Sequence, residues 1–208
     1  MEKKGAPDVI SRLPSAALCP VIDLGQLPHH YKGMPPDTNL EIKARCRSLA
    51  SLRSRVEPLA TEYVGMDHQI DTYFNTRQGR LKLRESALSG AQLIPYLRAD
   101  GVGPKRSDYR LIPIQDAEGV KQLLTALLGV HRVVRKEREI FLYENVRIHL
   151  DRVEGLGEFL ELEAVFSGAP QAEQGEHTRI EDLMKALEIS RDDLLETSYE
   201  ALLEETGQ

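Results

Sequence analysis

The chain has 208 residues, of which 41% are hydrophobic and 29% are charged, and its formal net charge is −6. This composition is typical of a globular protein with one core. No apolar stretch is long enough to span a bilayer, and the most apolar early stretch, 16–24, is broken by Pro20 and Asp23 and lacks the features of a signal peptide. Two cysteines, Cys19 and Cys46, cannot form a disulfide framework, so we expect reduced thiols and a cytoplasmic location.

The negative charge is concentrated at the end of the chain. Residues 171–208 hold eleven acidic and three basic residues, a local charge of −8, so residues 1–170 carry +2. A mildly basic body without a continuous basic face argues against nucleic-acid binding. It leaves room for a local basic pocket that binds a small anion.

Residues 1–38 contain six of the eleven prolines and show no periodicity, which predicts an extended or disordered lead before a single domain at 39–208. Within that domain, apolar alternation predicts strands at 39–47, 70–76, 80–85, 93–98, 107–114, 133–143, 145–153 and 158–166. Helical periodicity and caps predict helices at 49–63, 116–128, 178–187 and after Ser190, with residues 178–208 as an acidic helical end. Hairpin-linked strands with helices between and after them indicate an α+β fold on an antiparallel sheet or barrel.

Charged residues share one face of several predicted strands, because side chains two positions apart in a strand point the same way. The residues on these faces are Asn39, Glu41, Lys43 and Arg45; Arg80, Lys82 and Arg84; Tyr96 and Arg98; Lys136 and Arg138; Arg147, His149 and Asp151; and Glu161 and Glu163.

A solvent-facing sheet surface is also charged, but it mixes both signs on each strand to gain weak cross-strand pairs. Here one strand face, at 80–84, offers only cations, and another ends on the two carboxylates Glu161 and Glu163. If the sheet closes with this face inward, each unpaired ion costs several kcal/mol, which a bound polyanion and metal ions would offset. Periodicity alone leaves the closure open.

The charged segments, taken in order, resemble the motifs of the CYTH superfamily, the triphosphate tunnel metalloenzymes. Residues 39–45 are similar to its opening Glu-x-Glu-x-Lys strand. The segments that follow in the expected order are 71–74, 79–85, 103–109, 135–138, 146–151, 155–163 and 198–199. As a set over about residues 39–203 they resemble the class IV adenylate cyclase-like branch.

The resemblance implies a closed eight-stranded antiparallel β-barrel with flanking helices and a triphosphate tunnel. It implies a metal-dependent enzyme that either converts ATP to cyclic AMP and pyrophosphate or hydrolyses a nucleoside, thiamine or inorganic triphosphate. Mg²⁺ or Mn²⁺ is the implied cofactor, because hard cations bind carboxylate oxygens, and guanidinium groups match phosphate geometry.

Residue roles carried over from the family fall into three sets. The implied metal ligands are Glu41, Asp151, Glu161 and Glu163. The implied catalytic residues are Lys43, Glu41, Glu161 and Glu163. The implied substrate-binding residues are Lys43, Arg45, Arg80, Lys82, Arg84, Arg98, Lys136, Arg138 and Arg147.

Two positions in the opening motif carry further expectations. Lys43, crowded by other cations, loses its proton more readily and is expected to help activate water. Asn39 replaces the first glutamate of the family motif and brings no charge, so a second metal ion should bind more weakly.

Several alternatives remain open from the sequence. The chain is either an enzyme or a non-catalytic module that binds a nucleotide or polyphosphate, and cyclase and hydrolase use the same tunnel. His149 either contacts the substrate or is a hydrogen-bonded residue of the wall. We expect a small triphosphate as ligand, no membrane partner, and a monomer or a homodimer.

Overall fold

The structure is a computed structural model that describes residues 37–98, 103–166 and 170–207. The lead expected at 1–38 lies outside the described residues, apart from Asp37 and Thr38, which open the first strand. The strands are β1 (Asp37–Arg45), β2 (Glu62–Phe74), β3 (Arg80–Ser86), β4 (Gly90–Arg98), β5 (Lys105–Tyr109), β6 (Ile112–Ile114), β7 (Val130–Tyr143), β8 (Val146–Val153) and β9 (Gly157–Phe166). The α-helices are α1 (Leu49–Val56), α2 (Ala117–Leu128), α3 (Pro170–Ala186) and α4 (Tyr199–Glu205). No helix in the described ranges is long and apolar enough to cross a membrane.

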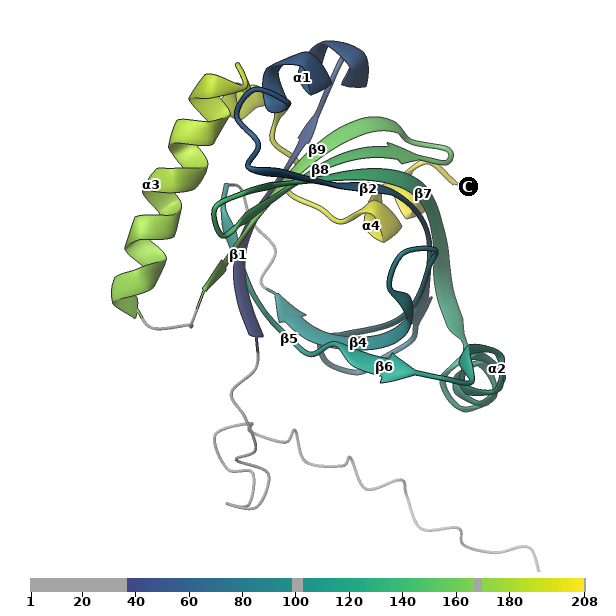
Figure 1. Cartoon of the computed structure of the whole chain (residues 1–208). Helices are drawn as coiled ribbons and strands as arrows, with labels where there is room; N and C mark the ends of the chain where they lie inside the picture. The colour runs from purple at the N-terminus through teal and green to yellow at the C-terminus, as the bar shows by residue number, and fades with distance from the viewer. Residues whose placement is uncertain (1–36, 99–102, 167–169, 208) are drawn as a thin grey trace, which may run out of the picture. The chain divides into compact units, whose positions relative to one another are not determined.

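Eight of the strands form a closed antiparallel barrel (Figure 1). They are hydrogen-bonded in the order β3-β2-β7-β8-β9-β1-β5-β4, and β4 pairs back onto β3 to complete the ring. The short β6 pairs with β4 as an additional strand. The closed eight-stranded barrel with flanking helices is therefore confirmed.

Alternation along the strands separates the outer apolar core from the interior. On β1, Leu40 and Ile42 are at most 2% exposed and belong to a cluster that includes Leu52 of α1 and Ile180 of α3. Both helices lie against the outside of the barrel (Figure 1), where α1 contacts β8, and α3 contacts β1 and β9. Because these helices cover the apolar face, the alternate polar face is directed inward.

The helix α4 is seen within the outline of the ring in Figure 1. Tyr199, Leu202 and Leu203 of this helix form a buried cluster with side chains from the strands, among them Val134 and Phe159. This cluster therefore borders the cavity, whose lining includes Tyr199.

Several sequence predictions need correction at the element boundaries. The strand predicted at 70–76 is the longer β2 from Glu62, and the helix predicted at 178–187 is the longer α3 from Pro170. The helix predicted at 49–63 begins after the cap Ser48 but ends at Val56, because Pro58 has no N–H to continue it, and β2 already starts at Glu62. The strand predicted at 107–114 is divided into β5 and β6. The helix predicted after Ser190 is only a 3-10 turn, which Ser190 and Asp193 close as a capping box.

Gly79, at the turn before β3, provides a test of the barrel geometry. Its φ is +68°, and an added Cβ would lie 2.7 Å from Leu97 Cδ2 and 3.0 Å from the Tyr96 carbonyl oxygen. We expect Gly79→Ala to lower the free energy of unfolding by about 1–3 kcal/mol, measured by urea denaturation.

Gly90→Ala is the matched control, since φ is +73° there but no atom lies within 4 Å of the added Cβ. Gly90→Ala should lower the free energy of unfolding only by the strain of placing a residue with a Cβ at positive φ. An equal loss at both positions would show that the close approach of β4 to Gly79 contributes nothing.

Candidate functional site

The barrel encloses a cavity of about 460 Å³, which is within the size range of small-molecule sites, and all eight barrel strands contribute to its wall. Within the described part of the chain, seven cations and four carboxylates line it. The cations are Lys43, Lys82, Arg84, Arg98, Lys136, Arg138 and Arg147, and the carboxylates are Glu41, Asp67, Glu161 and Glu163.

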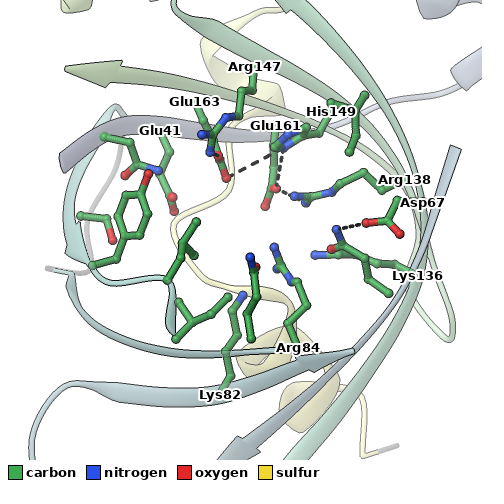
Figure 2. A pocket seen from close by; sticks show the side chains of 18 of the residues that line it. Glu41, Asp67, Lys82, Arg84, Lys136, Arg138, Arg147, His149, Glu161 and Glu163 are labelled. Carbon is green, nitrogen blue, oxygen red and sulfur yellow. Dashed lines mark hydrogen bonds and ion pairs between the residues drawn. The ribbon is translucent and has the colours of Figure 1, made fainter. Parts of the chain in front are cut away.

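The three glutamates gather on one side of the cavity and Lys82 and Arg84 on the facing side, while Arg147 lies beside Glu163 and Asp67 beside Lys136 (Figure 2). Glu161 and Glu163 come from β9 and Glu41 from the neighbouring β1, where Glu41 lies opposite Glu163 in the strand register. Lys82 and Arg84 extend into the cavity from β3 on the facing wall. A cavity with an acidic and a basic side can accommodate a cation and an anion together.

The glutamates are paired with cations of the wall. Glu161 forms ion pairs with Lys43 and Arg138, and Glu41 forms one with Arg98. Arg147 Nη1 lies 3.6 Å from Glu163 Oε2. These pairs offset the cost of burying the charges.

Lys43 occupies the boundary between the two sides. Its side chain is 7% exposed, and Nζ lies 3.6 Å from the centroid of the Tyr199 ring. Burial lowers the pKa of Lys43 to about 7, although Glu41 and Asp151 oppose the shift. An amine with this pKa can exchange a proton near neutral pH, and the role in water activation stays a prediction.

Two buried aspartates hold the cations of the basic side. Asp71 accepts hydrogen bonds from Arg84 Nε at 2.7 Å, Arg84 Nη2 at 2.8 Å and Lys82 Nζ at 3.0 Å, and Lys136 Nζ lies 3.6 Å away. Burial raises the pKa of Asp71, but the three cations outweigh it and hold that pKa well below its usual value.

Asp151 binds Arg138 through both of its oxygens, at 2.6 Å each, and its Oδ2 also accepts a hydrogen bond from the Tyr199 hydroxyl at 2.8 Å. The carboxylate is 0% exposed and does not line the cavity. The structure thus places Asp151 behind Arg138, which it orients, and apart from the carboxylates that face the cavity.

Three donors are close enough to share one metal ion. His149 of β8, Glu161 and Glu163 offer ligand atoms that all lie within 4.8 Å of one another, close to the spacing of opposite ligands around an ion with bonds of about 2.1 Å. Asn39 Oδ1 is buried and has no hydrogen-bond partner within the described residues, so a neutral oxygen is present as well. The residues fit a divalent cation.

The family model of the CYTH domain matches residues 38–199, which is most of the chain. The chain belongs to the CYTH family. It is 29% identical over 169 residues to a Methanocaldococcus jannaschii protein named "Putative adenylate cyclase", covering 77% of this chain and 95% of that protein.

Solved structures share the fold. A Pyrococcus horikoshii protein superposes with a TM-score of 0.69 at 24% identity, over 79% of this chain and 98% of that one. A Hippeastrum protein, described as a "Putative adenylyl cyclase" with a dominant triphosphatase activity, superposes with a TM-score of 0.55 at 15% identity, over 83% of this chain and 96% of that one.

Most residues expected to serve the CYTH site line one cavity, and three do not. Besides Asp151, these are Arg45, which is exposed with its guanidinium carbon 5.2 Å from the Phe159 ring centroid, and Arg80, whose Nε lies 3.0 Å from Glu200 Oε1. Arg45 ends β1 and Arg80 begins β3. The facing rule, by which side chains two positions apart in a strand point the same way, no longer decides where a long side chain points at the end of a strand.

The sequence analysis missed the part played by Asp71 and the tyrosines. Asp67, Gln69, Asp71 and Tyr73 alternate along β2, a pattern that the facing rule could have found. Tyr73, Tyr96, Tyr109 and Tyr199 line the cavity. Their rings resemble core residues in a sequence, but Lys82 Nζ lies 5.4 Å from the Tyr73 centroid and 5.8 Å from that of Tyr96, within cation–π range.

Asp71→Asn tests the support of the basic side. Removing one partner of a buried ion pair costs about 3–5 kcal/mol, so we expect a loss of that size in the free energy of unfolding at pH 7. Because the folded-state pKa of Asp71 is depressed, its stabilisation is present above the unfolded-state pKa of about 3.9 and is lost as the pH falls below it.

Urea denaturation from pH 7 to pH 2 should therefore show the difference between wild type and Asp71→Asn shrinking below about pH 4. Asp182→Asn is the control, since that carboxylate is 65% exposed in its pair with Lys185 and should matter little at any pH. A difference that is independent of pH would contradict the ion-pair role of Asp71.

Proposed function

We propose that this chain is a divalent-metal-dependent enzyme that cleaves the triphosphate group of a small substrate. The observation that carries the proposal is the division of one cavity into an acidic side, with a carboxylate and imidazole cluster, and a facing basic side. Phosphoryl transfer needs mainly alignment and charge neutralisation, and this arrangement supplies both.

The basic side would bind the phosphate oxygens. Arg84 and Arg138 present guanidinium groups whose planar donors match phosphate, and Lys82 and Lys136 add compact charges beside them. Asp71 and Asp151 fix the directions of these cations before a ligand arrives, which reduces the ordering needed when the substrate binds.

The acidic side would hold the metal through Glu161, Glu163 and His149, with Glu41 and Asn39 adjacent on β1. A bound divalent ion supplies neutralisation of the charge that develops on the phosphate oxygens. Lys43 and Arg138 are now paired with Glu161, and their charges would become available to the phosphates if a cation took their place on that carboxylate.

The rest of the cavity suits an organic group. Val64, Leu88, Leu111, Ile140 and Leu142 contribute apolar side chains to the lining. Such surface favours a nucleoside or another organic triphosphate over inorganic tripolyphosphate, because burying it against an organic group removes apolar area from water.

Two reactions fit this site. Water can attack the terminal phosphorus, which releases orthophosphate, or a hydroxyl of the substrate can attack the α-phosphorus, which releases pyrophosphate and closes a ring. The name of the Methanocaldococcus jannaschii relative supports the second, and the triphosphatase activity described for the Hippeastrum protein supports the first.

Product analysis with Glu161→Gln tests the proposal. Purified protein is incubated with Mg²⁺ or Mn²⁺ and ATP, thiamine triphosphate or tripolyphosphate, and the products are separated. We expect turnover of at least one organic triphosphate and a loss of about 100-fold or more in Glu161→Gln, since metal stabilisation of a transition state is worth several kcal/mol.

Glu137→Gln is the control. Glu137 lies on β7 with its side chain 46% exposed and paired with Arg152, and it should retain activity. Cyclic AMP with pyrophosphate would identify a cyclase, and orthophosphate a phosphohydrolase. No metal-dependent product from any of the three substrates would overturn the enzyme proposal in favour of a binding module, for which the neutral Asn39 is the supporting feature.

A further inference from the structure

His149 is a buried residue of the acidic side with a ring nitrogen that faces two carboxylates. It is 4% exposed, and its Nδ1 has no hydrogen-bond partner among the described residues. Nδ1 lies 3.6 Å from Glu161 Oε2 and 3.8 Å from Glu163 Oε1. Figure 2 shows the ring beside both glutamates, at the edge of the cavity.

A buried polar atom without a partner is uncommon in folded proteins and calls for a physical reason. The strand register brings His149 Nδ1 into this position. His149 of β8 lies directly opposite Glu161 of β9, and Arg147 lies directly opposite Glu163. Arg138 and Lys43 take the oxygens of Glu161, and Arg147 is the cation nearest Glu163. The nitrogen and the two carboxylates therefore lie together, and Glu161 Oε2, the oxygen near Nδ1, is also the one that Arg138 binds. A metal ion at this point would take the place of Arg138 on that oxygen.

We propose that His149 Nδ1 is a ligand of the divalent ion, together with Glu161 and Glu163, and that this nitrogen makes the site prefer a first-row transition ion over Mg²⁺. The inference deepens the function proposed above because it concerns the same site. It requires metal binding but not any particular reaction.

The donor chemistry supports this preference. Mg²⁺ favours an all-oxygen shell and is bound mainly through carboxylates, phosphates and water. Imidazole suits transition ions, and the affinity of a mixed nitrogen and oxygen site rises from Mn²⁺ to Co²⁺. Asn39 occupies the inward-facing position before Glu41 without a charge. The site thus lacks one hard anionic donor and gains one nitrogen.

Pulsed electron paramagnetic resonance of the full chain loaded with Mn²⁺ tests the ligand directly. Protein with ¹⁴N-histidine should show nitrogen coupling to the ion, which changes when only histidine is labelled with ¹⁵N. His149→Gln should lose the coupling. His68→Gln should keep it, since His68 is an exposed residue of β2 outside the cavity.

Titration with Co²⁺ and Mg²⁺ tests the selectivity. We expect His149→Gln to bind Co²⁺ about 10-fold or more weakly while its affinity for Mg²⁺ changes by less than about 3-fold. Absence of histidine coupling in the labelled wild type would overturn the inference, whether or not the variant folds. Equal losses for both ions in a folded variant would overturn the selectivity.

These readouts are independent of turnover. Histidine coupling without any product would support the inference about His149 and contradict the proposed enzymatic function. Product formation without histidine coupling would overturn the inference about His149 and leave the proposed enzyme standing.

Discussion

The interior of the barrel depends on the ion pairs that Asp71 and Asp151 form beneath the cavity surface. Cations packed on one wall repel one another, and each loses most of its hydration. Asp71 contacts Lys82, Arg84 and Lys136, while Asp151 binds Arg138. Two fully buried negative charges thereby allow a dense positive surface to exist in the absence of any ligand. The fold therefore presents a positively charged wall before any ligand binds, and the buried carboxylates offset the repulsion within it.

Side chains alternate between the inside and the outside of the barrel along each strand, and closure of the barrel brings the inward-facing charged ones into one site with two sides. β9 and β1 are neighbours in the ring and bring three glutamates together. β3 and β7 carry the four cations that lie around the two buried aspartates, and β2 between them carries Asp71. Tyr199 connects the two sides, since its hydroxyl binds Asp151 and its ring lies under Lys43. A helix near the end of the chain thus participates in a site that is otherwise made by strands.

Much of the site could be predicted from the facing rule. Glu41, Lys43, Lys82, Arg84, Glu161 and Glu163 sit in the middle of their strands, and all of them line the cavity. The rule failed for Arg45 and Arg80 at strand ends, where long side chains follow their partners. It was not applied to Asp71 and Tyr73 within the strand predicted at 70–76, and Asp67 and Gln69 lay before the predicted start of that strand, which in the structure begins at Glu62. Closure could not be derived from local periodicity, since β1 pairs with β9 more than a hundred residues away, as in Asn39 opposite Val165. The resemblance to a family supplied that step.

Tyr199 belongs both to the buried apolar cluster with Leu202 and to the lining of the cavity. Its ring centroid lies 3.6 Å from Lys43 Nζ, and its hydroxyl donates a hydrogen bond to Asp151. A substitution in the apolar packing around α4 would therefore displace charged groups of the cavity that it does not touch.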